Sequence, residues 1–584
     1  FQAEDGIRDA QESRGLGDVY KRQLQFHLPV MQFDPDGKYE HLQGKRLSID
    51  GINSLSTIYS VLSEKDLLSA LGWWKENHLD DINTKLDWTA HAFENKDNIE
   101  WIKKMDIVLI VIITYNILLL GIGYWSSRKT KNQQDFYLGN RDLGAWVAAL
   151  SASASSSSAW TLLGVSGAAY AWGLSTFWLL PGVLIGYYIS WTWVAPRLME
   201  ISHRTKAVTL PEVLFWNFDS KAKLILLRLS TIIILFSLTV YVAAQFQAAG
   251  TAFSTTLGFS KDISVILGAS IILLYTLIGG FWAVSLTDTI QAMVMLMIAI
   301  FLPLLLLLLI GGYEGLLTSI YATGSDEYKS FTGGAVGLTG LGFIIGSISI
   351  GFGYPGQPFV VNRFMATKDL KSIKRGRIIA MVWATIIFSG MITLGLCAKV
   401  MWSSVDNPET ILFFASERTL GPLFSGIVTA AVLSAIMSTA DSQLLSVSSS
   451  VDRDWTGGKE SNISRSRISI VLVTILATLI SLYAPATIFT RVIFAWTALG
   501  AAFVPMLVFR LLSKNVSAIA AGLSVVCGFS LTAVFHFLPD ITNGGDILER
   551  MVPMATGFLV LFLSLIHISA PTRLLSISYA VFCL

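Results

Sequence analysis

Two groups of hydroxyl-bearing residues lie inside apolar stretches that are long enough to cross a bilayer. Residues 151–160 read Ser-Ala-Ser-Ala-Ser-Ser-Ser-Ser-Ala-Trp, and residues 435–442 read Ala-Ile-Met-Ser-Thr-Ala-Asp-Ser. Serine side chains weaken a helix, and an unwound turn at bilayer depth is tolerated only where it lines a cavity or is buried in protein. Two polar-interrupted membrane segments, one in each half of a chain, are typical of the central binding site of a secondary transporter. We therefore expect these two segments to bind an ion or a small solute.

The composition indicates an all-α polytopic membrane protein. Hydrophobic residues make up 53% of the chain and charged residues only 14%, which is too apolar for a soluble protein of this size. The net charge of +2 does not indicate a nucleic-acid-binding protein. The three cysteines have no metal or redox spacing, and no hydrolase, metalloprotease or P-loop motif occurs. The sequence thus predicts neither an enzyme nor a cofactor beyond a coupling ion.

Charge density divides the chain near residue 105. The first 104 residues hold 18 of the 40 acidic side chains, and we expect a membrane domain over 105–563. Residues 1–23 and 564–584 resemble translated sequencing adapter, so we expect them to be artefacts and not part of the fold. Residues 24–104 are polar, and we interpret them as in-frame translation of sequence upstream of the natural start at Met105. The alternative for 24–104 is a small soluble region.

Apolar segments of about 20 residues alternate with short polar loops from Met105 onward. The thirteen expected spans are 107–125, 146–171, 176–196, 229–256, 263–279, 288–310, 337–355, 378–400, 421–446, 468–484, 488–509, 516–537 and 551–567. Lysine and arginine concentrate in alternate loops, at 128–141, 197–228, 363–377 and 453–467, so Arg363 counts as a loop charge. By the positive-inside rule these loops are cytoplasmic, which places the amino end of the membrane domain outside and the carboxyl end inside.

Several motifs together resemble one family. They are Phe136-Tyr137-Leu138-Gly139-Asn140-Arg141, Thr209-Leu210-Pro211, Ile278-Gly279-Gly280-Phe281, Gly353-Tyr354-Pro355-Gly356-Gln357-Pro358, Arg363-Phe364-Met365-Ala366 and Met437-Ser438-Thr439. In this order the chain resembles the sodium:solute symporters, and most of all the proline-transporting members. The resemblance covers nearly all of residues 106–563. It implies a LeuT-like inverted-repeat core of ten helices with flanking helices, in a bacterial-type plasma membrane.

The two interrupted segments offer neutral oxygen ligands. Ala435, Ser438 and Thr439 lie at i, i+3 and i+4, so one carbonyl and two hydroxyls can share a helix face. Ala154 and Ser157 can present carbonyls where their helix breaks. Sodium needs about five or six hard oxygen ligands, and the resemblance assigns these five positions to the sodium site. The alternative is that small residues at this spacing only allow close helix packing.

Two aspartates are candidates for a cation path. Asp288, at the expected inner start of the sixth span, matches an acidic position of the family and could attract sodium on the way to the cytoplasm. It could equally be a helix N-cap. Asp441 could gate the same path or only cap a polar face. Proton coupling stays open, because Ser156 stands where the proline symporters carry an aspartate. Neither His203 nor His536 lies in a central motif, which disfavours an imidazole relay.

A zwitterionic solute needs donors for its carboxylate and acceptors or ring faces for its ammonium. The resemblance and the segment positions nominate the substrate-binding residues Ser156, Ser158, Trp160, Tyr241, Tyr354, Gln357 and Pro358. Ile350 replaces a tryptophan of the proline symporters, which changes the expected pocket. We predict a sodium-coupled importer of proline or a related amino acid, with solute, sodium and lipid bilayer as its partners and no oligomeric state specified. The alternatives are a sodium- or proton-coupled carrier of another organic solute and a transporter-like membrane sensor.

Overall fold

The structure is a computed structural model that describes residues 25–29, 46–50, 96–127, 137–278, 280–458, 462–484, 486–537 and 545–566. The chain forms two compact units, Phe1–Asp106 and Ile107–Leu584. In the first unit, strands β1 (Gln25–Pro29) and β2 (Arg46–Asp50) pair antiparallel, with Gln25 opposite Asp50. Helix α5 (Lys96–Ser127) crosses the boundary. The adapter-like segment 1–23 and residues 567–584 of the adapter-like segment 564–584 lie outside the described residues. The expected division of the chain into natural and foreign parts stays a prediction.

The described residues of the second unit form helices joined by loops, with no strand among them. Its first half contains η3 (Gly139–Arg141), α7 (Ala145–Ser156), η4 (Trp160–Gly164), α8 (Val165–Trp172), η5 (Gly173–Trp178), α9 (Leu179–Ile189), η6 (Ser190–Val194), α10 (Ala195–Thr205), α11 (Leu210–Leu214), α12 (Ser220–Leu257), α13 (Lys261–Ile278) and α14 (Phe281–Leu309). The remaining elements are α15 (Gly312–Thr323), α16 (Asp326–Lys329), α17 (Gly337–Ser349), η7 (Ile350–Gly356), α18 (Pro358–Ala366), α19 (Leu370–Met401), η8 (Pro408–Thr410), α20 (Ile411–Thr419), α21 (Pro422–Ser449), η9 (Ser450–Asp454), α22 (Ile463–Tyr483), α23 (Ile488–Leu511), α24 (Ala518–Phe537) and α25 (Gly545–Arg550). Residues Ile547–Ile566 form the last apolar stretch, here called the last span.

Helix occupies each of the expected membrane ranges as far as the structure describes them. Eleven helical stretches among the described residues are long and apolar enough to cross a membrane. One of them, Trp160–Thr205, runs across two expected ranges, and α13 is not among the eleven. The fold class is therefore that of a multi-pass helical membrane protein, and the count of thirteen spans stays a prediction.

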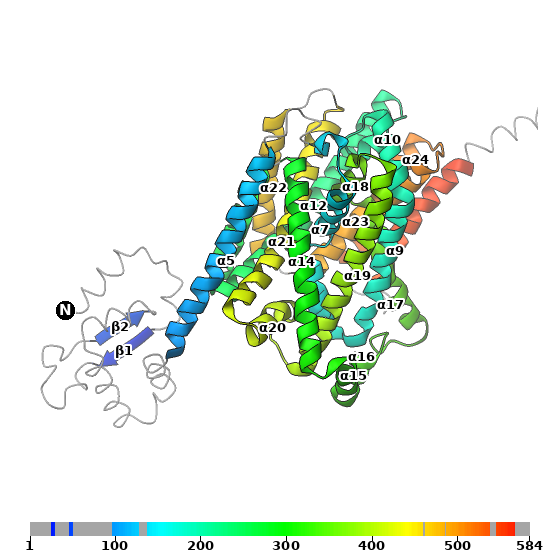
Figure 1. The fold of residues 1–584 in the computed structure, drawn as a ribbon. Coiled ribbons are helices and arrows are strands. Elements are labelled where there is room, and N and C mark those ends of the chain that lie inside the picture. Colours follow the sequence, from blue (N-terminus) through cyan, green and yellow to red (C-terminus); the bar gives the residue numbers. More distant parts are fainter. Residues whose placement is uncertain are drawn as a thin grey trace, which may run out of the picture. The chain divides into compact units, whose positions relative to one another are not determined.

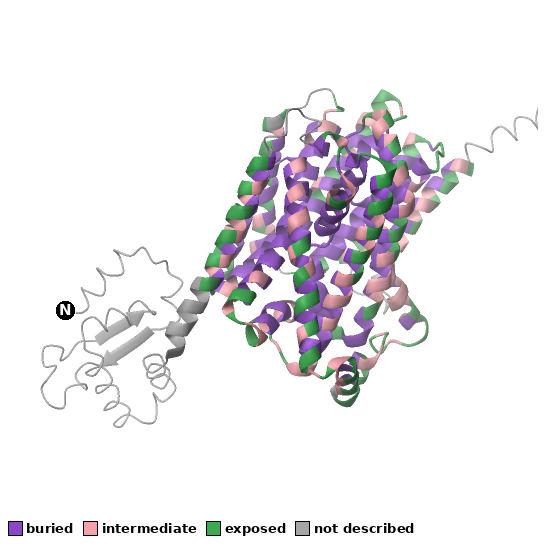
Figure 2. Cartoon of the chain, viewed as in Figure 1, coloured by how far each residue is buried: buried purple, intermediate pink, exposed green. Residues whose placement is uncertain are grey.

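The long helices of the second unit form one bundle, with α15 and α16 at one end and α10 at the other (Figure 1). Two helices form its centre, since the apolar windows of α21 and α23 are 83% and 94% buried. The windows of α24 and of the last span are 33% and 28% buried, so these helices are peripheral. Figure 2 shows the same contrast as buried ribbon inside and exposed ribbon on the outer faces of the bundle. The hydroxyl-rich α21 thus lies where its polar groups must find partners in protein.

Two membrane helices of the bundle are broken. Helix α7 ends at Ser156, inside the serine run, and the chain resumes as η4 at Trp160. The second break follows η7, whose tight turns end at Gly356 before α18 starts at Pro358. Residues 435–442 do not unwind, because α21 is continuous from Pro422 to Ser449. The break expected in the serine run is therefore present, and the second break lies in η7 rather than in the other polar segment.

Candidate ion and solute site

The carbonyl end of α7 meets the hydroxyls of α21. The Ser438 hydroxyl lies 3.3 Å from the Ala154 carbonyl oxygen and 3.4 Å from that of Ala435, and the Thr439 hydroxyl donates to the Ser155 carbonyl at 2.9 Å. All five residues are fully buried. The last carbonyls of a helix carry the negative end of its dipole and have no partner within the helix. The arrangement therefore gathers five neutral oxygens at a point that favours positive charge.

This oxygen cluster suits a monovalent cation. Its members are three backbone carbonyls and two hydroxyls, which are hard ligands without formal charge. The two separations at Ser438 exceed the usual O–H···O distance of about 2.7–2.8 Å, so neither carbonyl holds that hydroxyl tightly. Of the five sequence-predicted positions, Ala154, Ala435, Ser438 and Thr439 lie together. Ser157 caps α7 through its backbone N–H and lines the neighbouring cavity.

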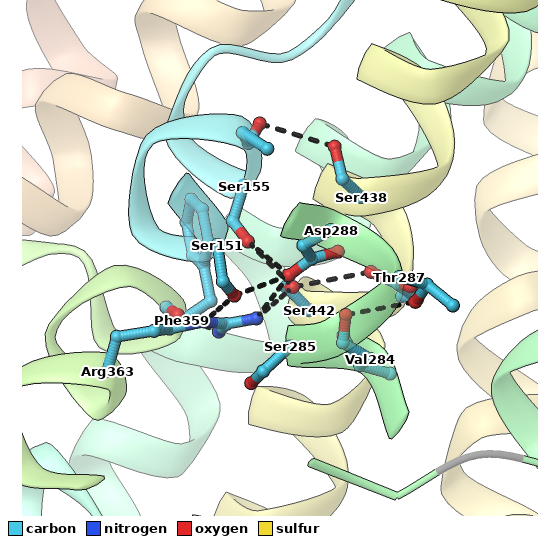
Figure 3. Close-up of polar contacts among 12 residues, drawn as sticks. Ser151, Ser155, Val284, Ser285, Thr287, Asp288, Phe359, Arg363, Ser438 and Ser442 are labelled. Carbon is cyan, nitrogen blue, oxygen red and sulfur yellow. Dashed lines mark hydrogen bonds and ion pairs between the residues drawn. The ribbon is translucent and has the colours of Figure 1, made fainter. Parts of the chain in front are cut away.

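Asp288 lies at the centre of a buried polar cluster formed by α7, α14, α18 and α21 (Figure 3). Its Oδ2 atom accepts from the Ser151 hydroxyl at 2.7 Å and from the Ser155 hydroxyl at 3.2 Å. The same oxygen pairs with the Arg363 guanidinium at 3.0 Å, and both side chains are buried. Asp288 is not a helix N-cap, because α14 begins seven residues earlier, at Phe281, after Gly280. That alternative is wrong, and the aspartate is part of an ion pair.

Arg363 is not a loop charge. It lies on α18 with 1% of its surface exposed, and it reaches Ser151 at 3.0 Å and Ser442 at 2.6 Å besides Asp288. The sequence reading placed it in a cytoplasmic loop because a lone arginine after an apolar stretch gives no sign of a partner 75 residues away. A buried guanidinium needs such partners to offset its loss of water. Asp288, the hydroxyls of Ser151 on α7 and Ser442 on α21, and the Phe359 backbone oxygen supply that environment.

Asp441 is the second buried carboxylate of this cluster. Its Oδ1 atom accepts from the Ser442 hydroxyl at 3.3 Å, and Ser442 in turn contacts both Arg363 and Ser155. Asp288 Oδ1 and Asp441 Oδ2 have no hydrogen-bond partner among the described residues. Two carboxyl groups thus share one guanidinium, and each keeps one oxygen without a partner among the described residues. The cluster can therefore attract a further cation one helical turn from the Ser438 oxygens.

A small cavity lies beside the α7 break. Four predicted solute residues line it, Ser156, Trp160, Tyr241 and Tyr354, together with Ser157. Tyr187, Phe388 and Trp496 complete most of its aromatic wall. Mostly apolar cavities with a few fixed polar groups are typical small-molecule sites. The structure thus brings polar groups of the break and several ring faces onto one cavity.

Three of the residues predicted to bind the solute lie behind this aromatic wall. Ser158 accepts from the Trp160 backbone N–H at 3.1 Å and from the Tyr241 hydroxyl at 3.4 Å. Gln357 donates to the backbone oxygens of Gly353 and Trp496, and Pro358 is buried at the start of α18. None of the three is among the lining residues of the cavity. Their contacts fix the two breaks, and direct solute contact stays a prediction for them.

Two of the residues that sequence reasoning missed support the cavity. Gln245 on α12 is fully buried and accepts the Ala159 backbone N–H at 3.1 Å, about one turn after Tyr241 along the same helix. Trp496 on α23 donates from Nε1 to the Ile350 backbone oxygen at 2.8 Å, and its ring lies 6.1 Å from that of Tyr354. Ile350 itself lines the cavity. The sequence signal that could have identified Gln245 is a glutamine within a long apolar segment.

A larger cavity lies beyond the aromatic wall, and Ile493 lines both cavities. Phe489 separates them, since its ring packs 5.7 Å from that of Trp160 and 5.1 Å from that of Trp172. The side chains of His536 and Glu549, 3.0 Å apart, contribute polar groups to the larger cavity. The small cavity is therefore closed on this side by one aromatic layer.

Comparisons with known proteins agree with this architecture. The sodium:solute symporter family profile matches residues 136–528. The osmoregulated proline transporter OpuE of Bacillus subtilis is 32% identical over 478 residues, covering 80% of this chain and 95% of that protein. The sodium/proline symporter of Escherichia coli is 31% identical over 445 residues, covering 73% of this chain and 87% of that protein.

A solved structure shows the fold. It is described as the substrate-bound outward-open state of a Na+-coupled sialic acid symporter, and it matches with a TM-score of 0.65 at 18% identity. The match covers 78% of this chain and 97% of that one. The bundle is therefore of the LeuT-like type, and both named relatives are transporters. The chain belongs to the sodium:solute symporter family.

Proposed function

We propose that this protein imports proline or a related amino acid together with sodium, by alternating access. The observation that carries the proposal is the contact between the α7 carbonyls and the Ser438 and Thr439 hydroxyls, directly beside the cavity at the α7 break. An ion bound there would link α7 to α21 and fix the backbone of the cavity wall. Ion binding and solute binding would then stabilise the same arrangement, which is the basis of coupled transport. The proline symporters among the relatives support the solute class.

The polar cluster around Asp288 would serve as the inner part of the cation path. It lies on the side of Ser438 toward the lysine- and arginine-rich loops, since Ser151 precedes Ser155 on α7 and Asp441 follows Ser438 on α21. By the positive-inside rule that side is cytoplasmic. The Arg363–Asp288 pair would hold α18 against α14 until an arriving cation competes for the carboxylate. Asp441, with one oxygen free of partners among the described residues, would receive that cation.

The solute would enter from the larger cavity. Phe489 and Trp160 would have to part for access to the small cavity, while the Arg363 cluster stays closed on the opposite side. Trp160, Tyr241 and Tyr354 would offer ring faces to an ammonium group or an aliphatic ring. Their arrangement favours a compact solute over an extended one. The loop charges support an orientation with the amino end of the membrane domain outside, and the bacterial relatives support a plasma-membrane location.

Counterflow tests the solute assignment. Proteoliposomes preloaded with one unlabelled solute from a panel of amino acids, sugars and carboxylic acids receive the same solute in labelled form in sodium buffer. We expect accumulation of label only with preloaded proline and close analogues, and none when choline replaces sodium. Accumulation with a sugar or an organic acid but not with proline would refute the amino-acid assignment and leave a carrier of another solute.

A further inference from the structure

An apolar groove lies on the far side of η7 from the solute cavity. It has a volume of about 330 Å³ and is lined by α9, η6, η7, α23 and the last span, with Trp193, Phe352, Val508, Ala555 and Phe558 among its residues. Every side chain on it is apolar or aromatic. Protein interiors contain few voids larger than a water molecule, and apolar cavities do not hold water well. A groove of this size and lining must therefore be filled by another apolar molecule.

The surroundings identify the class of that molecule. The lining elements belong to four of the apolar stretches that can cross a membrane, Trp160–Thr205, Gly337–Gly356, Ile488–Leu511 and the last span. Ile189 is 37% exposed and Ala555 is also exposed, so the groove is open to the outside of the bundle. The medium at that depth of a bilayer is hydrocarbon. Acyl chains are thus the molecules that reach the groove.

One end of the groove carries a cation. Arg197 lies one turn beyond Trp193, with its guanidinium 5.1 Å from the Trp193 ring and a bond to the Trp193 backbone oxygen at 3.0 Å. Arg197 is exposed, and no carboxylate lies within ion-pair distance of it among the described residues. Tryptophan and arginine at the end of a membrane helix mark the level of lipid headgroups. A basic side chain at that level attracts anionic headgroups.

We propose that this groove binds one acyl chain of an anionic phospholipid from the surrounding bilayer, with its phosphate at Arg197. The chain fills the space between Phe352, Val508 and Phe558, which are partly buried against the Val504 and Met554 core. The groove shares Gly351 with the solute cavity. A Cβ atom added at Gly351 would overlap the Gly182 backbone oxygen, so α9 and η7 pack backbone to backbone there. The lipid chain thus packs against the back of the broken segment that forms the cavity wall.

Native mass spectrometry of the full chain in detergent tests this site without relying on transport. The probe is an equimolar mixture of phosphatidylglycerol and phosphatidylcholine with identical acyl chains. Ala555→Trp fills the groove, and Leu559→Trp is its control, since Leu559 is 57% exposed on the same span but does not line the groove. Arg197→Gln removes the cation, and Arg204→Gln is its control, an exposed arginine that lies 5.8 Å from Trp216 and away from the groove.

We expect the wild type and both control variants to retain one phosphatidylglycerol in preference to phosphatidylcholine. Ala555→Trp should lose that lipid, and Arg197→Gln should lower the preference by about five-fold, which corresponds to about one basic contact with an anionic headgroup. Retention unchanged in Ala555→Trp would overturn the site. Equal retention of both lipids by the wild type, or a dimer whose formation Ala555→Trp abolishes, would also overturn it, the latter by showing that a second copy covers the groove. If Ala555→Trp does not fold, Arg197→Gln against Arg204→Gln still decides.

Discussion

The hydroxyls of Ser438 and Thr439 are the side-chain groups that can be removed from the oxygen cluster with little change in volume. Replacing either residue with alanine deletes one candidate ligand of sodium and leaves the backbone carbonyls in place. Loss of one hydrogen bond or ligand to a charged group costs about 1.5–3 kcal/mol, so the sodium concentration for half-maximal uptake should rise about ten- to hundred-fold. The measurement is initial uptake against sodium concentration for Ser438→Ala and Thr439→Ala, normalised to protein in the membrane.

A packing role for these two residues makes a different prediction. Serine and alanine are close in size, so Ser438→Ala would then be nearly silent. A Thr439→Ala defect would appear as less protein in the membrane rather than as altered sodium dependence. Unchanged half-saturation for sodium in both variants would rule out ligation by these hydroxyls.

Removing one partner of the Arg363–Asp288 pair should strongly destabilise the protein, whereas replacing both partners together should destabilise it much less. Both side chains are buried, so Arg363→Gln leaves a buried carboxylate without its counterion, which destabilises a protein by about 3–5 kcal/mol. We expect strongly reduced abundance and melting temperature for Arg363→Gln and recovery of most of the loss in Arg363→Gln/Asp288→Asn. Thermal melting in detergent measures both variants. An undiminished melting temperature for Arg363→Gln would mean that the pair does not form.

Among the elements, the α7 break depends on α12. Gln245 accepts the Ala159 N–H and Tyr241 donates to Ser158, so two residues one turn apart hold the unwound backbone. Gln245→Leu leaves that buried N–H without a partner, at a cost of about 1–3 kcal/mol. We expect the half-saturation concentration for the solute to rise more than that for sodium, because the cavity wall loosens while the α21 hydroxyls stay in place. Gln245→Glu, which keeps the acceptor, is the control. Equal effects of Gln245→Leu on both half-saturation values would contradict a role confined to the break.

Glu409 makes the anchoring of α23 sensitive to pH. Its carboxylate accepts the backbone N–H groups of Ile488 and Phe489, yet burial raises the pKa of this carboxyl above its ordinary value. The folded protein therefore binds the Glu409 proton more tightly than the unfolded chain does. The protonated carboxyl contributes its full share to the free energy of unfolding below the unfolded pKa, and this contribution is lost as the pH rises through the folded pKa. The variant Glu409→Gln cannot titrate, so its melting temperature should fall less than that of the wild type between pH 4.5 and pH 7, and the gap between the two proteins should change with pH. A gap of the same size at both pH values would contradict this account.

The two breaks show what could and could not be predicted from sequence. The serine run predicted the end of α7, because serine side chains compete with the helix for backbone hydrogen bonds. The hydroxyls of α21 form no break, since several of them, such as Ser434 and Ser448, bond to carbonyls of their own helix while Ser438 and Thr439 face α7. The Gly-Phe-Gly-Tyr-Pro-Gly sequence of residues 351–356 carried the signal for the second break and was read only as a family motif.

Other features depended on contacts between distant residues. Arg363 and Asp288 are 75 positions apart, and neither sequence neighbourhood indicates that they form a buried pair. Hydropathy predicted the ranges of the membrane helices because each range must supply an apolar surface of bilayer length. It could not show which helices are central, since α21 and α23 are about as apolar as the peripheral α24.

At the scale of the whole molecule, two barriers lie on opposite sides of the small cavity. Phe489 closes it from the larger cavity, and the Asp288–Arg363 cluster lies beyond the Ser438 oxygens on the other side. A transporter that opened both barriers at once would leak its ion gradient. The proposed ion site touches α7 and α21, and the inner cluster includes residues of the same two helices. Ion occupancy could therefore bias which barrier opens.

The central claim is that a sodium gradient drives uptake, and one measurement tests it most directly. Proteoliposomes containing the protein receive labelled proline either with an inward sodium gradient at equal pH or with an inward proton gradient in sodium-free buffer. The account predicts concentrative uptake in the first condition, abolished by a sodium ionophore, and none in the second. Uptake that survives collapse of the sodium gradient but disappears when the proton gradient is removed would contradict it.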